Sequence, residues 1–238
     1  MADPDTRRPP VEAVIFDWGG TLTPWHTIDF REEAEALAEA AVGADHTAPE
    51  LLRAAADAVW GRSRDEHTSA TIADLFAHAG LFHDEELLTA YREFWEPHTA
   101  TDPDVPPLFD RLHADDIRVG VLSNTIWPRD WHEEFFRRDG VLELIHGAVY
   151  TSEVPWTKPA PEAFRAAMDA VGAVDPQACV FVGDRLFDDI WGASNVGMRT
   201  ILVPHSSIPE EQIGHSVGEP DAVAHRLSEV HDIVSRWR

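Results

Sequence analysis

The stretch Val11-Glu-Ala-Val-Ile-Phe-Asp17-Trp-Gly-Gly-Thr21-Leu-Thr23 decides the fold. A mostly apolar run, rich in β-branched residues, ends in a carboxylate and two glycines, which predicts a buried strand that delivers Asp17 into a tight loop. Gly19 and Gly20 let the backbone turn sharply and approach a ligand, and the Thr21 hydroxyl suits an oxyanion. An ordinary Asp-x-Gly turn gives the same local pattern, so the assignment depends on other parts of the chain.

The composition describes a soluble globular protein. The 238 residues suffice for one sizeable core, alone or with a smaller inserted domain, and 44% of them are hydrophobic and 26% charged. Nineteen basic and 43 acidic residues give a formal charge of −24, so we expect no nucleic acid partner and no anionic membrane partner. The single cysteine, Cys179, lies in an apolar run, which predicts a buried thiol.

The N-terminal segment is polar and lacks an apolar signal core. No stretch approaches the about 20 apolar residues that span a bilayer. We therefore expect a cytoplasmic protein. Its oligomeric state and its physiological substrate are not indicated by the sequence.

After Pro24 the hydrophobic spacing becomes helical. Asp29 and Glu32 resemble a capping box before a helix over residues 34–42, and three more helices are predicted from Pro49 to residue 60, over 72–79 and after Asp84. Four helices without a strand predict a separate all-helical domain over residues 24–100. This domain interrupts a core formed by residues 1–23 and 101–238.

From residue 104 onward, helices and strands alternate. Strands are expected at 117–122, 148–150, 178–182 and 200–203, and helices at 108–113, 131–137, 161–171, 188–195 and 222–237. This alternation predicts an α/β fold, a three-layer doubly wound parallel sheet with helices on both faces. The active crevice of such a sheet lies at the carboxyl ends of its strands.

Two polar stretches are candidates for holding an anion. Ser123 and Asn124 end a predicted strand, where a hydroxyl, an amide and free N–H groups can bind phosphate oxygens, although Ser-Asn is also a common helix start. Lys158 is the only lysine beside eighteen arginines, and prolines flank it. This suggests that a compact ammonium is needed there, unless the arginine-biased composition left one lysine by chance.

A third stretch carries two carboxylates. Gly183 at a strand end exposes Asp184, and Asp189 follows one helical turn later, so both can face the crevice of Asp17. Hard oxygen ligands of this number suit Mg²⁺. If Asp188 and Asp189 merely cap a helix, one carboxylate is explained, but Gly-Asp at the strand end is not.

Together these stretches resemble a known family. The order Asp17…Thr21, Ser123, Lys158-Pro159 and Gly183-Asp184…Asp189 is similar to the four motifs of the haloacid dehalogenase-like hydrolase superfamily. The resemblance runs across nearly the whole chain. It implies that the helical domain is the family's inserted cap, which covers the active site.

The resemblance also implies roles for single residues. Asp17 would be the nucleophile that forms an aspartyl-phosphate, assisted by Thr21 and Lys158. The transferring group would be bound by Ser123 and Lys158, and Mg²⁺ would be held by Asp17, Asp184, Asp189 and the backbone carbonyl of Gly19. From their residue types, Asn124 and the main chain of Gly20 are also expected to contact the substrate. The expected activity is Mg²⁺-dependent hydrolysis of a small phosphorylated metabolite.

One position departs from the family pattern. Phosphatases of the family usually carry a second aspartate two residues after the nucleophile, where this chain has Gly19. General acid–base help is worth about 10²–10⁴ in rate, so esters with poor leaving groups should react slowly. His26 is a candidate replacement, and a plain surface histidine is the alternative. Four tryptophans beside the motifs either line the crevice or pack in the core: Trp18, Trp25, Trp127 and Trp156.

Other activities share part of this pattern. Asp-Trp-Gly-Gly-Thr resembles phosphonoacetaldehyde hydrolases, which use a cap lysine, but residues 24–100 contain no lysine. Dehalogenases of the superfamily also lack the second aspartate but do not need the Gly-Asp pair. A phosphate-binding protein that has lost catalysis is a further alternative, yet a binder needs no nucleophile. A metal-dependent phosphatase therefore remains the preferred prediction.

Overall fold

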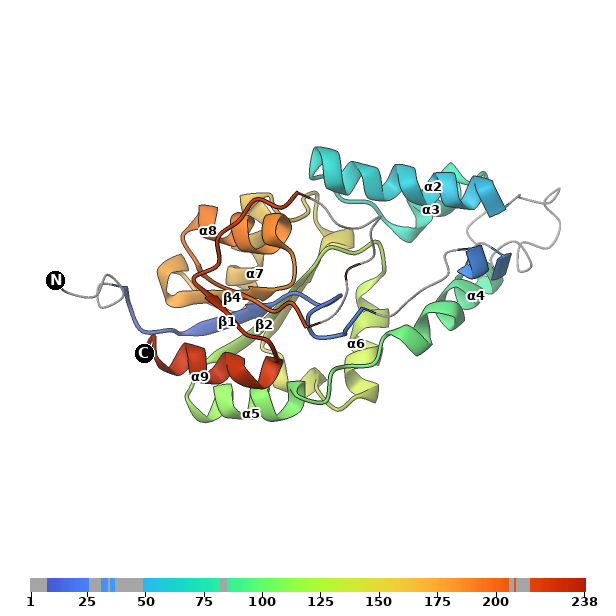
Figure 1. Cartoon of the computed structure of the whole chain (residues 1–238). Helices are drawn as coiled ribbons and strands as arrows, with labels where there is room; N and C mark the ends of the chain where they lie inside the picture. The colour runs from blue at the N-terminus through green and yellow to red at the C-terminus, as the bar shows by residue number, and fades with distance from the viewer. Residues whose placement is uncertain are drawn as a thin grey trace.

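A six-stranded parallel sheet forms the centre of the molecule (Figure 1). The computed structural model describes residues 8–25, 31–33, 35–36, 49–81, 85–205, 208 and 215–238. In sheet order the strands are β3 (Gly147–Tyr150), β2 (Arg118–Ser123), β1 (Ala13–Phe16), β4 (Cys179–Gly183), β5 (Arg199–Leu202) and β6 (Ala222–Val223). The order of the strands confirms the predicted doubly wound sheet, with β1 at its centre.

The first strand is apolar throughout because both of its faces are covered. Ala13 and Ile15 pack into one hydrophobic cluster, and Val14 and Phe16 pack into another on the opposite side. All four side chains are fully buried. Continuous burial of this kind is the mark of a parallel strand between two helical layers, and it explains why the strand reads as an unbroken apolar run.

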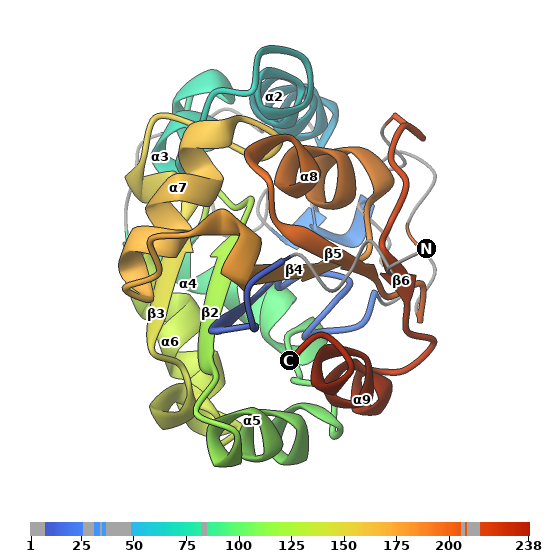
Figure 2. The ribbon, with the colours of Figure 1, turned by 90° about the vertical axis from the view of Figure 1, so that its left-hand side faces the viewer.

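Helices cover both faces of the sheet (Figure 2). One layer contains α7 (Pro161–Ala170) and α8 (Gly192–Val196), which contribute to the cluster around Ile15. The other contains α5 (Val105–Ala114), α6 (Arg129–Arg138) and α9 (Val230–Ser235), which contribute to the cluster around Phe16. Short 3₁₀ turns complete the connections at Leu142–Leu144, Thr151–Glu153, Pro176–Ala178 and Leu227–Glu229.

A group of helices lies beyond the carboxyl ends of the strands (Figure 1). This helical module comprises residues 31–33 and 35–36, α2 (Pro49–Gly61), a π-helical turn (Arg62–Glu66), α3 (Ile72–His78), α4 (Glu85–Trp95) and a 3₁₀ turn (Glu96–His98). Thr71 caps α3, because its hydroxyl accepts from Asp74 N and its own N–H donates to Asp74 Oδ2. His26, the expected Asp29 cap and most of the expected helix over 34–42 lie outside the described residues.

Two segments that were expected to form single α-helices have another secondary structure in part. The segment 222–237 is not one helix: Ala222 and Val223 form strand β6 beside β5, and α9 begins only at Val230. Asp221 holds this strand in place, since its Oδ2 accepts from Thr200 N over 2.8 Å. The segment 188–195 begins as a π-helical turn, Leu186–Trp191, before α8.

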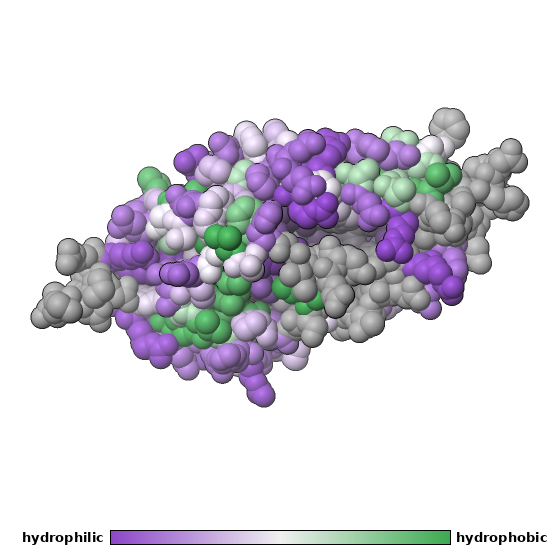
Figure 3. All heavy atoms as spheres, turned by 45° about the horizontal axis from the view of Figure 1, so that its top comes forward, coloured by the Kyte–Doolittle hydropathy of each residue, from purple (hydrophilic) through white to green (hydrophobic). Residues whose placement is uncertain are grey.

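The polar exterior agrees with the 26% of charged residues in the composition. Hydrophilic side chains predominate on the face shown in Figure 3. Among the described residues, no helix has the length and apolar character that a membrane span requires.

Candidate active site

The register of the sheet brings the predicted polar residues to one edge. Phe16 is level with Val121 on β2 and Val182 on β4. Asp17 therefore follows its strand at the same edge as the residues that end β2 and follow β4. The Asp17 N–H donates to Val182 O over 2.8 Å, which fixes the start of the loop.

Three buried carboxylates meet one ammonium at this edge. Asp17, Asp184 and Asp189 each offer an oxygen within 4.8 Å of the others. Lys158 Nζ lies 2.5 Å from Asp17 Oδ1 and 2.7 Å from Asp189 Oδ1. All four side chains are at least nine-tenths buried. Residues separated by up to 172 positions in the sequence thus form one charged cluster.

The charges of this cluster do not cancel. Three carboxylates and one ammonium leave two negative charges when all groups are ionised. Burial raises the pKa of Asp17 and of Asp184, and the neighbouring carboxylates add to the effect on both. Burial acts to lower the pKa of Lys158, but Asp17 and Asp189 outweigh it and raise that pKa above its usual value. The ammonium therefore stays protonated at neutral pH.

The donor set fits a divalent cation. Asp184 Oδ1 is buried without a hydrogen-bond partner among the described residues, so this oxygen is available for a metal. A doubly charged ion would cancel the two excess negative charges. Carboxylate oxygens are the ligands that Mg²⁺ prefers, and Mg²⁺ typically takes one or two of them together with substrate phosphate and water.

The loop after β1 requires glycine at position 20. Gly20 has φ +89°, and a Cβ atom on it would lie 2.2 Å from Asp184 Oδ2 and 2.1 Å from Trp25 Nε1. Trp25 Nε1 donates to the same Asp184 oxygen over 2.8 Å. The Gly20 N–H donates to Thr23 O, so the substrate contact expected from Gly20 does not come from a free N–H group.

Gly19 is different. A Cβ atom there would have Trp25 Cη2 as its nearest neighbour, at 4.0 Å, so a side chain has room at this position.

Thr21 is fully buried, and its Oγ1 lies 3.4 Å from Asp17 Oδ2. That hydroxyl orients the Asp17 carboxylate from the side opposite Lys158.

The sequence did not identify His205, which binds the backbone of the loop after β1. Its Nε2 donates to Gly20 O over 3.0 Å and to Thr21 O over 2.9 Å, and its Nδ1 lies 3.7 Å from Asp102 Oδ2. His205 comes shortly after β5. Its place near the carboxyl end of a predicted strand was the one feature of the sequence that could have identified it.

Ser123, the last residue of β2, and Asn124, which follows it, differ in their contacts. Ser123 is buried and lines the cavity beside Asp17. Asn124 also lines it, but its Oδ1 accepts from Lys158 N over 2.8 Å and its Nδ2 donates to Lys158 O over 3.0 Å. This reciprocal pair favours a positioning role for Asn124, which fixes the backbone of Lys158, over the predicted phosphate contact.

A cavity of about 270 Å³ extends from Asp17 and Lys158 to the helical module. Trp18, Trp25 and Trp127 line it, whereas Trp156 does not and is 39% exposed. Sequence reasoning missed a part of the wall that the helical module contributes: Glu33, Leu52, Trp60, Leu75, Tyr91 and Trp95. No local pattern separates these side chains from ordinary core or surface residues of amphipathic helices.

Comparison with known proteins agrees with this geometry. The family model of haloacid dehalogenase-like hydrolases matches residues 11–197, which contain all the carboxylates of the cluster and Lys158. The chain belongs to this family. It is therefore a hydrolase, and the resemblance seen in the four motifs is confirmed.

Among its relatives, the glyceraldehyde 3-phosphate phosphatase of Methanopyrus kandleri is 27% identical over 94% of this chain and 97% of its own length. Among solved structures, a 2-haloacid dehalogenase from Pseudomonas syringae pv. tomato is 25% identical with a TM-score of 0.65, covering 96% of this chain and all of that one. A phosphatase of the same family from Thermococcus onnurineus has a TM-score of 0.63 at 21% identity, covering 94% and 98% of the two chains.

Proposed function

We propose that this haloacid dehalogenase-like hydrolase is a Mg²⁺-dependent phosphatase that acts on a small phosphorylated metabolite through an aspartyl-phosphate on Asp17. The observation that carries the proposal is the buried cluster of Asp17, Asp184 and Asp189 around Lys158. Similarity to a phosphatase over nearly the full length of both chains supports it.

Each residue of the cluster has a part in this reaction. An oxygen of Asp17 attacks phosphorus, the bond to the leaving oxygen breaks, and water later cleaves the acyl phosphate to release phosphate and restore the carboxylate. Lys158 holds Asp17 in place and offers positive charge to the phosphoryl oxygens, and Ser123 lies beside it in the cavity. Thr21 orients the second oxygen of Asp17.

Asp17, Asp184 and Asp189, with the carbonyl of Gly19, are the proposed ligands of Mg²⁺. Bound there, the ion would neutralise charge on the carboxylates and on the phosphate, so that two anionic groups can approach each other. We further propose that the helical module is a cap over this site, because it contributes about half of the cavity's wall residues.

The leaving oxygen must obtain a proton without the usual second aspartate. Among the described residues, the chain neighbours of Gly19 aside, Trp25 has the only atom within 4 Å of a Cβ placed at Gly19, and its indole does not titrate. We therefore expect good activity only towards esters whose leaving group is stable without prompt protonation.

The test is hydrolysis of p-nitrophenyl phosphate with and without Mg²⁺. The purified protein should turn over this ester only when Mg²⁺ is present, and Asp17→Asn should reduce kcat at least about 10³-fold because an amide is not a nucleophile. Asp169→Asn removes an exposed carboxylate of α7 and is the matched control. Equal turnover by the wild type and Asp17→Asn would contradict the proposal.

A dehalogenase is the second candidate, because a solved dehalogenase shares the fold over 96% of this chain and the second aspartate is missing here. The three-carboxylate cluster favours the phosphatase. Release of chloride from 2-chloropropionate without Mg²⁺, together with no release of phosphate from any ester, would favour the dehalogenase.

A further inference from the structure

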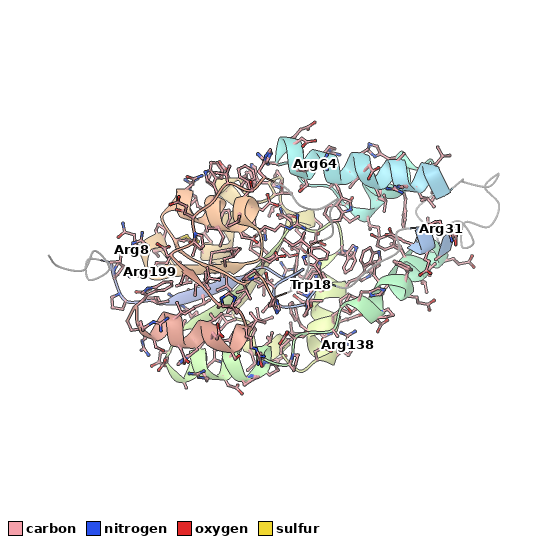
Figure 4. The ribbon with its side chains drawn as sticks, viewed as in Figure 1. Arg8, Trp18, Arg31, Arg64, Arg138 and Arg199 are labelled. Carbon is pink, nitrogen blue, oxygen red and sulfur yellow. The ribbon has the colours of Figure 1, made fainter. Side chains whose placement is uncertain are left out.

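Glu33 is a carboxyl group of the cavity wall that the proposed reaction does not use. It belongs to the helical part of the module at residues 31–33 and lines the same cavity as Asp17. In Figure 4, Trp18 lies near the centre of the molecule and Arg31, at the start of this helical segment, lies towards the far end of the module. Glu33 thus belongs to the part of the cavity wall that the helical module contributes, whereas Asp17 belongs to the loop after β1.

Glu33 is held by aromatic side chains. Trp95 Nε1 donates to Glu33 Oε1 over 2.8 Å, and the Tyr91 hydroxyl is a second hydrogen-bond partner of the carboxyl group. Trp127 Nε1 in turn donates to the Tyr91 hydroxyl over 3.4 Å. These bonds fix the carboxylate in one orientation, which is the condition for a selective contact rather than a mobile surface charge.

The same aromatic side chains form a continuous wall towards the catalytic loop. The rings of Trp95 and Trp127 lie 5.5 Å apart at 62°, and those of Trp127 and Trp18 lie 5.5 Å apart at 65°. Trp18 follows Asp17 directly in the chain. A ligand whose phosphate reaches Asp17 can therefore extend along indole rings to Glu33.

No ion pair within the described part of the chain includes Glu33. Three arginines also line the cavity: Arg64 pairs with Asp65 and Arg185 with Asp188, and Arg53, an exposed residue of α2, forms no ion pair with Glu33. Burial raises the pKa of Glu33 to about 7, although the hydrogen bonds from Trp95 and Tyr91 oppose the shift. A partly buried carboxylate of this kind is disfavoured until a cation joins it.

An ammonium group fits these surroundings. Aromatic faces attract cations, indole most strongly, and a carboxylate adds a charge-assisted hydrogen bond. The formal charge of −24 also favours the approach of a ligand with a cationic end over that of a polyanion.

We propose that Glu33, with Tyr91, Trp95 and Trp127, is a specificity site that binds an ammonium group at the end of the leaving group remote from the phosphate. The preferred substrates are then phosphorylated amines. This inference rests on the proposed phosphatase function, because it assigns the opposite end of the same substrate.

The test compares two series of ligands of increasing chain length, ω-aminoalkyl phosphonates and the matched alkyl phosphonates, which bind but are not hydrolysed. Calorimetry with the Mg²⁺-loaded protein should give a Kd at least about tenfold lower for the best amino compound than for its alkyl counterpart. Glu33→Gln should abolish this preference. Glu35→Gln, on the same segment but exposed and paired with Arg31, is the control that should keep it.

Equal affinities for the two series, a preference that survives in Glu33→Gln, or no binding of either series would overturn the inference. Hydrolysis of the corresponding phosphates separates this failure from a failure of the phosphatase function. If alkyl phosphates or p-nitrophenyl phosphate are turned over with Mg²⁺ but amines are not preferred, only the specificity site is wrong. If Glu33→Gln lowers kcat on all esters and leaves the ammonium preference intact, Glu33 serves proton transfer instead, and the inference is also overturned.

Discussion

Lys158 Nζ donates to Asp17 Oδ1 over 2.5 Å, and the same ammonium reaches Asp189 Oδ1 over 2.7 Å. This contact joins residues 141 positions apart in the chain. It places the only lysine of the protein against the proposed nucleophile, in a site where the lysine is 2% exposed. The position of Lys158 against Asp17 thus gives a structural reason for one lysine in an arginine-rich chain.

Replacement of this lysine by arginine should impair the enzyme. The planar guanidinium is larger than an ammonium and cannot occupy the point between Asp17 and Asp189, so Lys158→Arg should lower kcat by about 10²-fold or more. Steady-state hydrolysis of p-nitrophenyl phosphate measures the effect, and circular dichroism confirms that the variant is folded. Activity close to that of the wild type would mean that the lysine reflects composition rather than chemistry.

Gly19→Asp tests the missing acid. The nearest atom to a Cβ at this position is Trp25 Cη2, at 4.0 Å, so the new carboxyl has room. If proton transfer to the leaving oxygen limits the reaction, alkyl phosphates should be hydrolysed faster, by up to about 10²–10⁴-fold, while an activated aryl phosphate should gain little. Gly19→Asn, which adds the same bulk without an acid, is the control. A loss on both substrates would show that the protein has another proton donor or does not need one.

Gly20→Ala should destabilise the protein through a specific collision. The added Cβ would meet Asp184 Oδ2 and Trp25 Nε1 in a left-handed backbone conformation, so the free energy of unfolding should fall by at least about 2 kcal/mol. Gly140→Ala is the matched control, because Gly140 has φ +75° and no atom within 4 Å of the added Cβ. Urea denaturation of both variants should show the larger loss for Gly20→Ala. Equal losses would mean that backbone strain alone accounts for the effect.

Mg²⁺ binding should depend on pH. Burial raises the pKa of Asp17 and of Asp184, so near neutral pH the metal-free cluster retains protons that a cation must displace. Affinity should therefore increase as pH rises, by up to about tenfold per pH unit for each displaced proton. Calorimetry at pH 6 and pH 8, in buffers of different ionisation enthalpy, measures both Kd and proton release. A Kd that does not change with pH would contradict the raised pKa values.

Much of this fold can be predicted because the strands carry strong local signals. Residues 13–16 are buried on both faces, so their apolar run predicts a parallel strand, and the carboxylate that ends the run marks the active edge. Strand β6 was missed because Ala222 and Val223 are too short a pair to show any period. Their pairing depends on Asp221 and Thr200, a contact between distant residues that no local pattern contains.

The residues of the candidate site also fall into two groups, those whose place the sequence predicted and those whose place it did not. Asp17, Asp184, Asp189 and Lys158 follow strands or flank helix starts, and the sheet register brings them together as the motifs predict. Asn124 and Gly20 were assigned to the substrate because of their residue types, but their polar groups bond within the protein. The wall around Glu33 depends on how the helical module packs over the sheet, which sequence periodicity does not specify.

The most direct test of the account is to look for the covalent intermediate. The Mg²⁺-loaded protein is mixed with p-nitrophenyl phosphate, quenched in acid within the first turnovers, digested, and analysed by mass spectrometry. The account predicts one added phosphoryl group on the peptide that contains Asp17, and its loss on treatment with hydroxylamine, which cleaves acyl phosphates. A protein that turns over the ester while this peptide never carries the phosphoryl group, or carries it equally in Asp17→Asn, would contradict the central claim.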